Sequence, residues 1–130
     1  MISGLEATAD ALMQFEGWFI HDHGVPSMSY RNRNPGNLET NGQKRVYTSL
    51  VDGYSDLLRD LKAKFTGLNS HGLGPNSKLS DLMAIYAPAG DSNPVIAYTN
   101  FVAHWITLAT GKETTPDTRL GDIWTGGTSP

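Results

Sequence analysis

The segment that decides the fold is residues 93–111, which read NPVIAYTNFVAHWITLATG. Asn93 is a favoured N-cap residue, Pro94 suits the first helical turn, and Gly111 is a typical helix stop. Apolar side chains lie almost all round the helix between them: Val95, Ile96, Tyr98, Phe101, Val102, Trp105, Ile106 and Leu108. A helix that is apolar on every side is typical of a domain interior. The sequence therefore predicts a buried central helix with the rest of the chain packed around it.

The first helix is predicted over about residues 5–16. Ser3 and Glu6 have capping-box spacing, and Gly17 offers a stop. One face of this helix is formed by residues at helical spacing: Leu5, Ala9, Leu12, Glu16 and Phe19. The apolar face of this helix therefore contains a carboxylate.

Three further helices are predicted around the central one. Ser49 and Asp52 mark the start of a long helix with an apolar stripe from Leu50 to Phe65, and its charged residues Arg59, Asp60, Lys62 and Lys64 are expected to face water. Short helices are expected over residues 79–86, ending before Pro88, and over residues 116–124.

A small β-ribbon is predicted over residues 36–49, because Asn41-Gly42 is a hairpin signal and residues 44–49 alternate. Residues 21–29 are expected to form a loop. The element order gives an α+β fold, mainly α, in one domain over residues 1–124, with residues 125–130 as a flexible tail.

Composition excludes several classes of function. The 130 residues carry a net charge of −3, which argues against binding to nucleic acid. The absence of cysteine excludes disulfides, thiolate metal sites and cysteine nucleophiles. The N-terminal residues lack the pattern of a signal peptide, and no apolar run reaches the ~20 residues of a membrane helix. A monomer with no cofactor and no membrane insertion is expected.

Glu16 is the most informative position for chemistry. An apolar helix face and the last turn of a helix both favour the neutral carboxylic acid, so the pKa of Glu16 should rise. A carboxylic acid that is protonated near neutral pH is what a glycosidase needs to protonate a leaving oxygen. The alternative is an outward-pointing glutamate at a frayed helix end, and the pattern alone does not choose between the two.

The segment 31–38 is rich in side-chain amides, which suit sugar hydroxyls and N-acetyl groups, although a polar turn with internal hydrogen bonds has the same composition. Arg31, Arg33, Lys44 and Arg45 outnumber Glu39 here and form a basic patch that could meet an anionic polymer. The four histidines lack the spacing of a helical metal motif, so no metal site is expected.

Several motifs occur in order along nearly the whole chain: Glu16-Gly17, the run Arg31-Asn32-Arg33-Asn34-Pro35-Gly36-Asn37-Leu38, the Tyr54 helix, Tyr86-Ala87-Pro88-Ala89, Asp91-Ser92-Asn93-Pro94 and Tyr98. Together they resemble a small lysozyme-like domain, of the type found in phage endolysins and virion-associated lytic transglycosylases. The resemblance implies a cleft between the β-ribbon and the helical lobe that binds the glycan strands of peptidoglycan.

The resemblance also implies roles for single residues. Glu16 matches the catalytic acid, and the side chains that would shape the substrate-binding cleft are Asn34, Asn37, Tyr86 and Tyr98. Val25 stands where some phage endolysins carry an aspartate nine residues after the glutamate. The second carboxylate of a hydrolase would then have to be Asp22, Glu39 or Asp91, whereas a lytic transglycosylase can work with one acid.

The expected activity is cleavage of the β-1,4 bond between N-acetylmuramic acid and N-acetylglucosamine, by a muramidase or lytic transglycosylase mechanism. Two alternatives are a non-catalytic peptidoglycan-binding module of the same fold and a chitinase-like glycosidase. The lack of a signal peptide suits a phage-encoded or virion-associated protein, or a delivered effector, that acts in the periplasm or on the cell wall.

Overall fold

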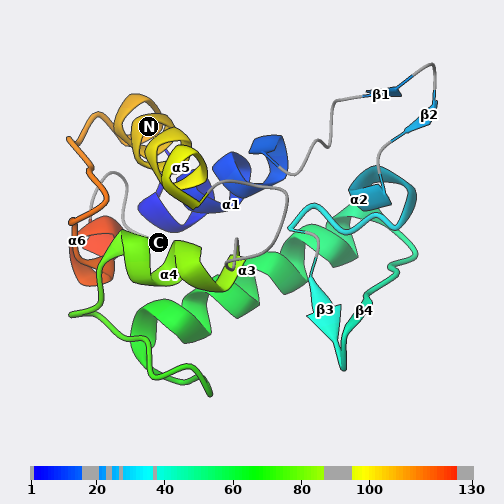
Figure 1. Ribbon diagram of the computed structural model, residues 1–130, viewed down its shortest axis with the longest axis horizontal. Helices are drawn as coiled ribbons and strands as arrows, with labels where there is room; N and C mark the ends of the chain where they lie inside the picture. Colours follow the sequence, from blue (N-terminus) through cyan, green and yellow to red (C-terminus); the bar gives the residue numbers. More distant parts are fainter. Residues whose placement is uncertain are drawn as a thin grey trace.

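The computed structural model describes residues 2–15, 21–22, 25–26, 28–36, 38–86 and 95–125. These residues form a mainly helical fold with short antiparallel strands, as predicted (Figure 1). The order of elements is α1 (Gly4–Phe15), β1 (His21–Asp22), β2 (Val25–Pro26), α2 (Met28–Arg31), β3 (Glu39–Thr40), β4 (Gln43–Lys44), α3 (Leu50–Thr66), α4 (Leu79–Tyr86), α5 (Val95–Thr110) and α6 (Leu120–Thr125).

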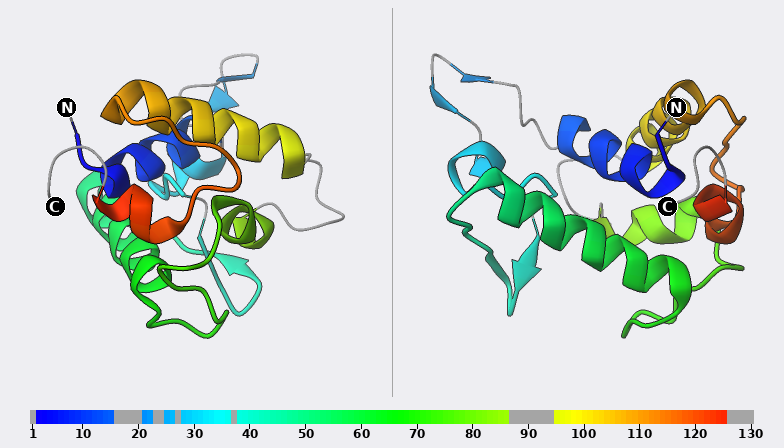
Figure 2. Two further views of the ribbon diagram at one scale, coloured as in Figure 1. Left: turned by 90° about the vertical axis from the view of Figure 1, so that its left-hand side faces the viewer. Right: turned by 180° about the vertical axis from the view of Figure 1, so that it is seen from behind.

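The most enclosed helix is α1 rather than α5. It packs against α3, α5 and α6, and Figures 1 and 2 show it between α5 and α3. Its buried residues are mostly small: Gly4, Leu5, Ala7, Thr8, Ala9, Ala11 and Leu12. Small side chains let neighbouring helices approach on several sides, which explains why α1 occupies the centre.

The expectation that α5 is buried on every side is wrong. It buries Tyr98, Val102 and Ile106, but Ile96 is 78% exposed and Leu108 is 71% exposed. The apolar pattern of α5 therefore exceeds what its neighbours α1 and α4 can cover.

Two of the three helix starts predicted from capping residues are confirmed by hydrogen bonds, and the third, at Asn93-Pro94, lies outside the described residues. The Ser3 Oγ accepts a hydrogen bond from the Glu6 backbone N–H at 3.2 Å and donates one to the Glu6 carboxylate at 3.0 Å. The Ser49 Oγ accepts from the Asp52 N–H at 3.2 Å and caps α3 in the same way. These caps satisfy backbone donors that have no partner within the helix.

The predicted hairpin turn is also confirmed, but the ribbon is shorter than expected. Asn41 and Gly42 both have positive φ, 54° and 80°, which is the requirement of a two-residue hairpin turn between β3 and β4. The strand expected over residues 44–49 ends at Lys44. Beyond it, the Tyr47 N–H donates to the Asn32 carbonyl at 2.8 Å, so this segment is bonded to the preceding turn and not to a strand.

The segment before the ribbon contains more structure than the loop that the sequence predicted. β1 and β2 form an antiparallel pair with His21 opposite Pro26, and α2 follows. Strands of two residues and a helix of four are too short for periodicity to reveal.

α3 connects the two ends of the molecule. α2 and the hairpin β3–β4 lie beside its first half, whereas α4 and α6 lie beside its second half (Figures 1 and 2). α6 begins four residues later than the predicted helix and reaches Thr125, one residue beyond the predicted domain end. Residues 126–130, expected to be the tail, lie outside the described residues. No helix of the described ranges is long and apolar enough to cross a membrane.

Candidate functional site

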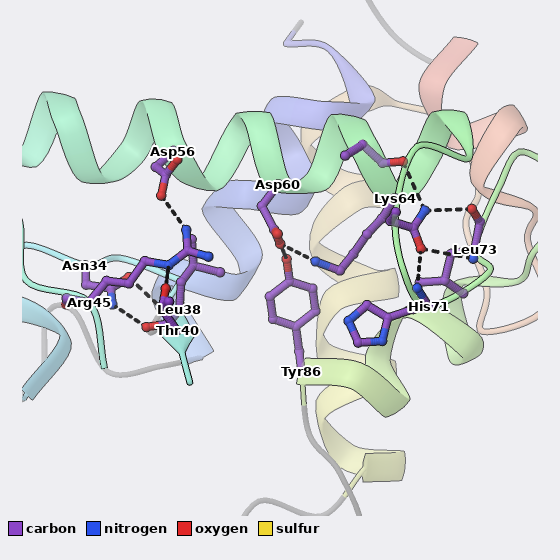
Figure 3. Close-up of polar contacts among 12 residues, drawn as sticks. Asn34, Leu38, Thr40, Arg45, Asp56, Asp60, Lys64, His71, Leu73 and Tyr86 are labelled. Atoms are coloured by element: carbon purple, nitrogen blue, oxygen red, sulfur yellow. Dashed lines mark hydrogen bonds and ion pairs between the residues drawn. The ribbon is translucent and has the colours of Figure 1, made fainter. Parts of the chain in front are cut away.

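The amide-rich turn at residues 32–38 is held in place by the side chain of Asn34. This side chain is fully buried. Its Nδ2 group donates to the carbonyls of Leu38 at 2.9 Å and Arg45 at 3.0 Å, and its Oδ1 accepts from the Leu38 N–H at 2.9 Å (Figure 3). Asn34 thus joins the turn to the segment after the hairpin. In this geometry its amide is not accessible to a glycan, so the substrate contact predicted from the sequence has no support here.

The same turn packs closely on α3. A Cβ atom on Gly53 would lie 1.9 Å from the Arg33 carbonyl oxygen and 3.0 Å from Pro35 Cδ. Only glycine permits this approach, because the opposing atom belongs to the backbone. Arg33 itself adopts a φ of 50°, which is uncommon for a residue with a side chain. The turn is therefore fixed against α3.

Asp56 of α3 ties the segment after the hairpin to the helix. Its carboxylate accepts hydrogen bonds from the Tyr47 hydroxyl and from the Arg45 guanidinium, and it pairs with Arg59 at 3.0 Å. Burial disfavours the anion, but the hydrogen bonds from Tyr47 and Arg45 outweigh it and hold the pKa of Asp56 below its usual value. Asp56 is therefore an ionised anchor at neutral pH.

One turn further along α3, Asp60 and Lys64 form a part-buried ion pair, and the hydroxyl of Tyr86 in α4 is hydrogen-bonded to Asp60. The Tyr86 hydroxyl donates to Asp60 Oδ2 at 2.5 Å, and the Lys64 ammonium donates to the same oxygen (Figure 3). The ammonium also lies 5.3 Å from the centre of the Tyr86 ring. The prediction that Lys64 faces water is wrong, since only 8% of its side chain is exposed, whereas Asp60 keeps 24% of its side chain exposed. Tyr86 of α4 contacts both groups on this face of α3.

The phenol of Tyr86 remains protonated at neutral pH. Burial, followed by the negative charge of Asp60, raises the pKa of Tyr86 well above its usual value. The positive charge of Arg45 opposes this rise only weakly. The hydroxyl is therefore a fixed hydrogen-bond donor at the end of α4, with Asp60 as its acceptor.

The end of α1 meets α5 through an aromatic stack. The rings of Phe15 and Tyr98 are 3.8 Å apart and nearly parallel, at 14°, and Phe101 lies 5.4 Å from Phe15. Tyr98 is fully buried, so the direct substrate contact predicted for it has no support in this conformation. Its ring instead packs on Phe15, the last residue of α1. The next residue in the sequence is Glu16, the candidate acid, which lies outside the described residues.

A second carboxyl–phenol pair joins α1 to α3. The Tyr54 hydroxyl donates to Asp10 Oδ1 at 2.7 Å. Burial raises the pKa of Asp10, aided by the nearby charge of Glu6 and opposed by the hydrogen bond from Tyr54. This pair was not predicted from the sequence, and neither was the pairing of Asp60 with Lys64, although the i, i+4 spacing of the latter was a signal.

The three candidates for a second carboxylate are not brought together by the described residues. Glu39 lies on the exposed hairpin, where it pairs with Lys44 at 2.9 Å. Asp22 lies in β1, and nothing is described of its side chain. Asp91 and the predicted cleft residue Asn37 lie outside the described residues.

Metal-ligating side chains do not cluster in the part of the chain that the structure describes. No group of three or more histidine, aspartate or glutamate side chains there is placed to hold a metal ion. His71 and His104 are both exposed.

The comparisons with known proteins add no relative. No protein-family model matches this chain, and no curated protein or solved structure matches it significantly.

Proposed function

We propose that this protein cleaves the glycan strand of peptidoglycan at the β-1,4 bond between N-acetylmuramic acid and N-acetylglucosamine, with Glu16 as the general acid. The observation that carries the proposal is the stacking of Phe15 on Tyr98 at the end of α1. It fixes the residue before Glu16 among aromatic side chains, because Phe15 also contacts the ring of Phe101. Aromatic surroundings and the C-terminal end of a helix both favour a protonated carboxyl group.

Glu16 would donate its proton to the bridging oxygen as the glycosidic bond breaks. In a lytic transglycosylase, Glu16 would then act as a base, and the 6-hydroxyl of the muramic acid would attack the anomeric carbon. No second carboxylate is needed, because the nucleophile is already part of the substrate and its effective molarity can reach about 10⁵ M. A hydrolase instead needs a second carboxylate about 5–9.5 Å from the first.

The partners of two carboxylates on α3 favour the one-acid mechanism. Of the carboxylates near the turn and α4, Asp56 is held by two arginines and a tyrosine, and Asp60 by Lys64 and Tyr86. Both are occupied with structural partners. We therefore infer a lytic transglycosylase in preference to a muramidase, within the broader class of glycan-strand cleaving enzymes.

Purified sacculi provide the test. The released muropeptides are reduced with borohydride and analysed by mass spectrometry. A transglycosylase yields 1,6-anhydro ends, which are lighter than the reduced hydrolytic product by one water and two hydrogens. Reducing ends alone would refute the one-acid mechanism, and chain binding without release of any product would indicate a binding module. Soluble products from chitin but not from sacculi would indicate a chitinase.

Glu16→Gln tests the assignment of the acid. The amide keeps the size of the side chain but has no transferable proton, so lytic activity should fall by about 10²–10⁴-fold. Glu113→Gln, an exposed glutamate after α5, serves as the matched control. Near-normal activity of Glu16→Gln with an unchanged melting curve would remove Glu16 from the mechanism.

The activity should also decline toward high pH as Glu16 loses its proton. The midpoint of that decline is expected above about 4.3, the ordinary pKa of a glutamate. Activity that kept rising into the alkaline range would indicate a different acid.

A further inference from the structure

Two arginines on the turn beside α3 are exposed, and neither side chain forms a hydrogen bond or ion pair among the residues that the structure describes. They are Arg31, the last residue of α2, and Arg33. The other two cations of this region are compensated, because Lys44 pairs with Glu39 and Arg45 pairs with Asp56. Arg31 and Arg33 therefore carry the uncompensated charge of the region.

The region that contains these arginines carries a positive net charge, although the net charge of the whole protein is negative. Residues 28–48 together with Asp56, the partner of Arg45, have a net charge of +2, whereas the whole chain has −3, so the remaining residues carry −5. A positive surface of this kind attracts an anion while the rest of the molecule repels it. The charge distribution thus favours one orientation of the protein on an anionic ligand.

The backbone that carries the two arginines is held firmly. The Arg33 N–H donates to the Tyr30 carbonyl at 3.0 Å, and the Asn32 carbonyl accepts from Tyr47 at 2.8 Å. The φ of 50° at Arg33 is uncommon for a residue other than glycine, asparagine or aspartate. Strained backbone of this kind is concentrated at functional sites. An arginine kept at such a position is consistent with a role for its side chain.

We propose that Arg31 and Arg33 bind carboxylates of the peptide stems attached to the glycan strand; this inference rests on the proposed function. The planar guanidinium group of arginine matches a carboxylate with two parallel hydrogen bonds. In an intact cell wall the lactyl carboxyl of muramic acid is amide-linked to the stem. The carboxylates of the intact polymer are therefore in the stems, and a stem offers more than one.

The test compares three substrates: strands with intact stems, strands with stem carboxylates neutralised by amidation, and strands stripped of stems by an amidase. The stripped strands carry the free lactyl carboxylate, so they separate the two sources of the charge. For wild type, kcat/KM on intact strands should exceed that on the other two by roughly 3- to 10-fold at low salt. The preference should disappear in about 1 M salt, where the screening length is only about 3 Å.

The double variant Arg31→Gln/Arg33→Gln should lose this preference. The ratio of kcat/KM on intact strands to that on amidated strands should fall by the same roughly 3- to 10-fold. Lys62→Gln/Arg119→Gln is the matched control, because it removes two exposed cations from other parts of the surface and should keep the wild-type ratio. An equal ratio in the double variant and wild type would overturn the proposal, and a wild-type preference for stripped strands would assign the arginines to the lactyl carboxylate instead.

Binding separates this inference from the proposed function. Co-sedimentation of Glu16→Gln protein with intact and amidated sacculi measures stem recognition without cleavage. Binding that falls on amidation, and falls equally when both arginines are replaced, supports the inference even if wild type releases no product. Cleavage with binding that is insensitive to amidation would refute the inference and leave the proposed function intact.

Discussion

Replacing Asn34 by aspartate distinguishes a structural role of this side chain from contact with a ligand. The substitution keeps the volume and the Oδ1 acceptor of the Leu38 N–H, but it exchanges the NH₂ group for an oxygen. That oxygen would face the carbonyl oxygens of Leu38 and Arg45, which accept hydrogen bonds at 2.9 and 3.0 Å in the wild type. Two attractive contacts therefore become repulsive in a fully buried site.

The expected loss of stability follows from these two contacts. Each lost hydrogen bond costs about 0.5–1.5 kcal/mol, and buried carbonyls left without donors add to this. We expect the free energy of unfolding to decrease by about 2–4 kcal/mol, compared with the 5–15 kcal/mol that is usual for a whole domain. The midpoint of urea denaturation should therefore fall by about 1–2 M.

The pH dependence of the Asn34→Asp variant has a defined sign. Burial without a compensating cation raises the pKa of the new carboxyl in the folded state above its unfolded value of about 3.9. The unfolded state then releases its proton first as the pH rises, so the penalty is largest at neutral pH and decreases as the pH falls through the folded pKa. A protonated carboxyl can also donate to one of the two carbonyls.

Urea denaturation near neutral pH and at mildly acidic pH provides the measurement. Asn76→Asp, the same change at an exposed loop position, is the matched control and should leave stability within about 0.5 kcal/mol. If Asn34→Asp unfolded like wild type but lost cleavage or binding of sacculi, the structural role would be refuted, and Asn34 would be assigned to the ligand.

Three other substitutions test the contacts around α3. Gly53→Ala places a Cβ 1.9 Å from a backbone carbonyl oxygen and should lower the free energy of unfolding by at least about 2 kcal/mol, measured by thermal or urea unfolding. Gly74→Ala, whose Cβ would lie 3.7 Å from its nearest atom, is the control and should cost much less. Equal effects of the two substitutions would contradict the close packing. Asp56→Asn should destabilise by about 1–3 kcal/mol at neutral pH. Because the pKa of Asp56 is lowered in the folded state, its contribution to stability is present above about pH 4 and is lost as the pH falls through the folded pKa. The difference in stability between this variant and wild type should therefore disappear in acid. A difference that is independent of pH would refute the role of Asp56 as an ionised anchor. Lys64→Met should lower the free energy of unfolding by about 2–3 kcal/mol, because it leaves Asp60 without its cation. Replacing Asp60 by leucine as well should restore part of this stability. If the losses from the two substitutions simply add, the interaction between the two side chains is refuted.

The helix ends and the hairpin turn could be predicted because their determinants are local. The side chains of Ser3 and Ser49 cap their helices by accepting from backbone N–H groups three residues away, and Asn41-Gly42 provides the two positive φ angles of the turn. The lengths of the strands could not be predicted in this way. The segment at Tyr47 bonds to Asn32, which is distant in sequence, and this bond replaces the strand pairing that alternation indicated.

The candidate site was predictable in part. The order of motifs marked the turn at Asn34 and the helix ends at Tyr86 and Tyr98, and the structure describes how these side chains are held. The roles of Asn34 and Tyr98 could not be predicted from residue type, because an amide or a phenol can either contact a ligand or form a buried structural contact. Burial decides between these roles, and burial depends on the neighbouring elements.

By itself, the sequence determined the class of the fold, the starts of α1 and α3 and the position of the β3–β4 turn, since these depend on residues within one or two turns of each other. Only the tertiary structure decided which helix lies at the centre and which charges are enclosed. α5 has the more apolar sequence, yet α1 is surrounded, because its alanines and glycine admit neighbours on several sides. Lys64 and Asp60 have the spacing of a solvated surface pair, yet α4 packs over them and supplies Tyr86 as a third partner. The hydrophobic periodicity of a sequence shows which residues share one face of a helix, whereas the burial of those residues depends on how several helices pack together.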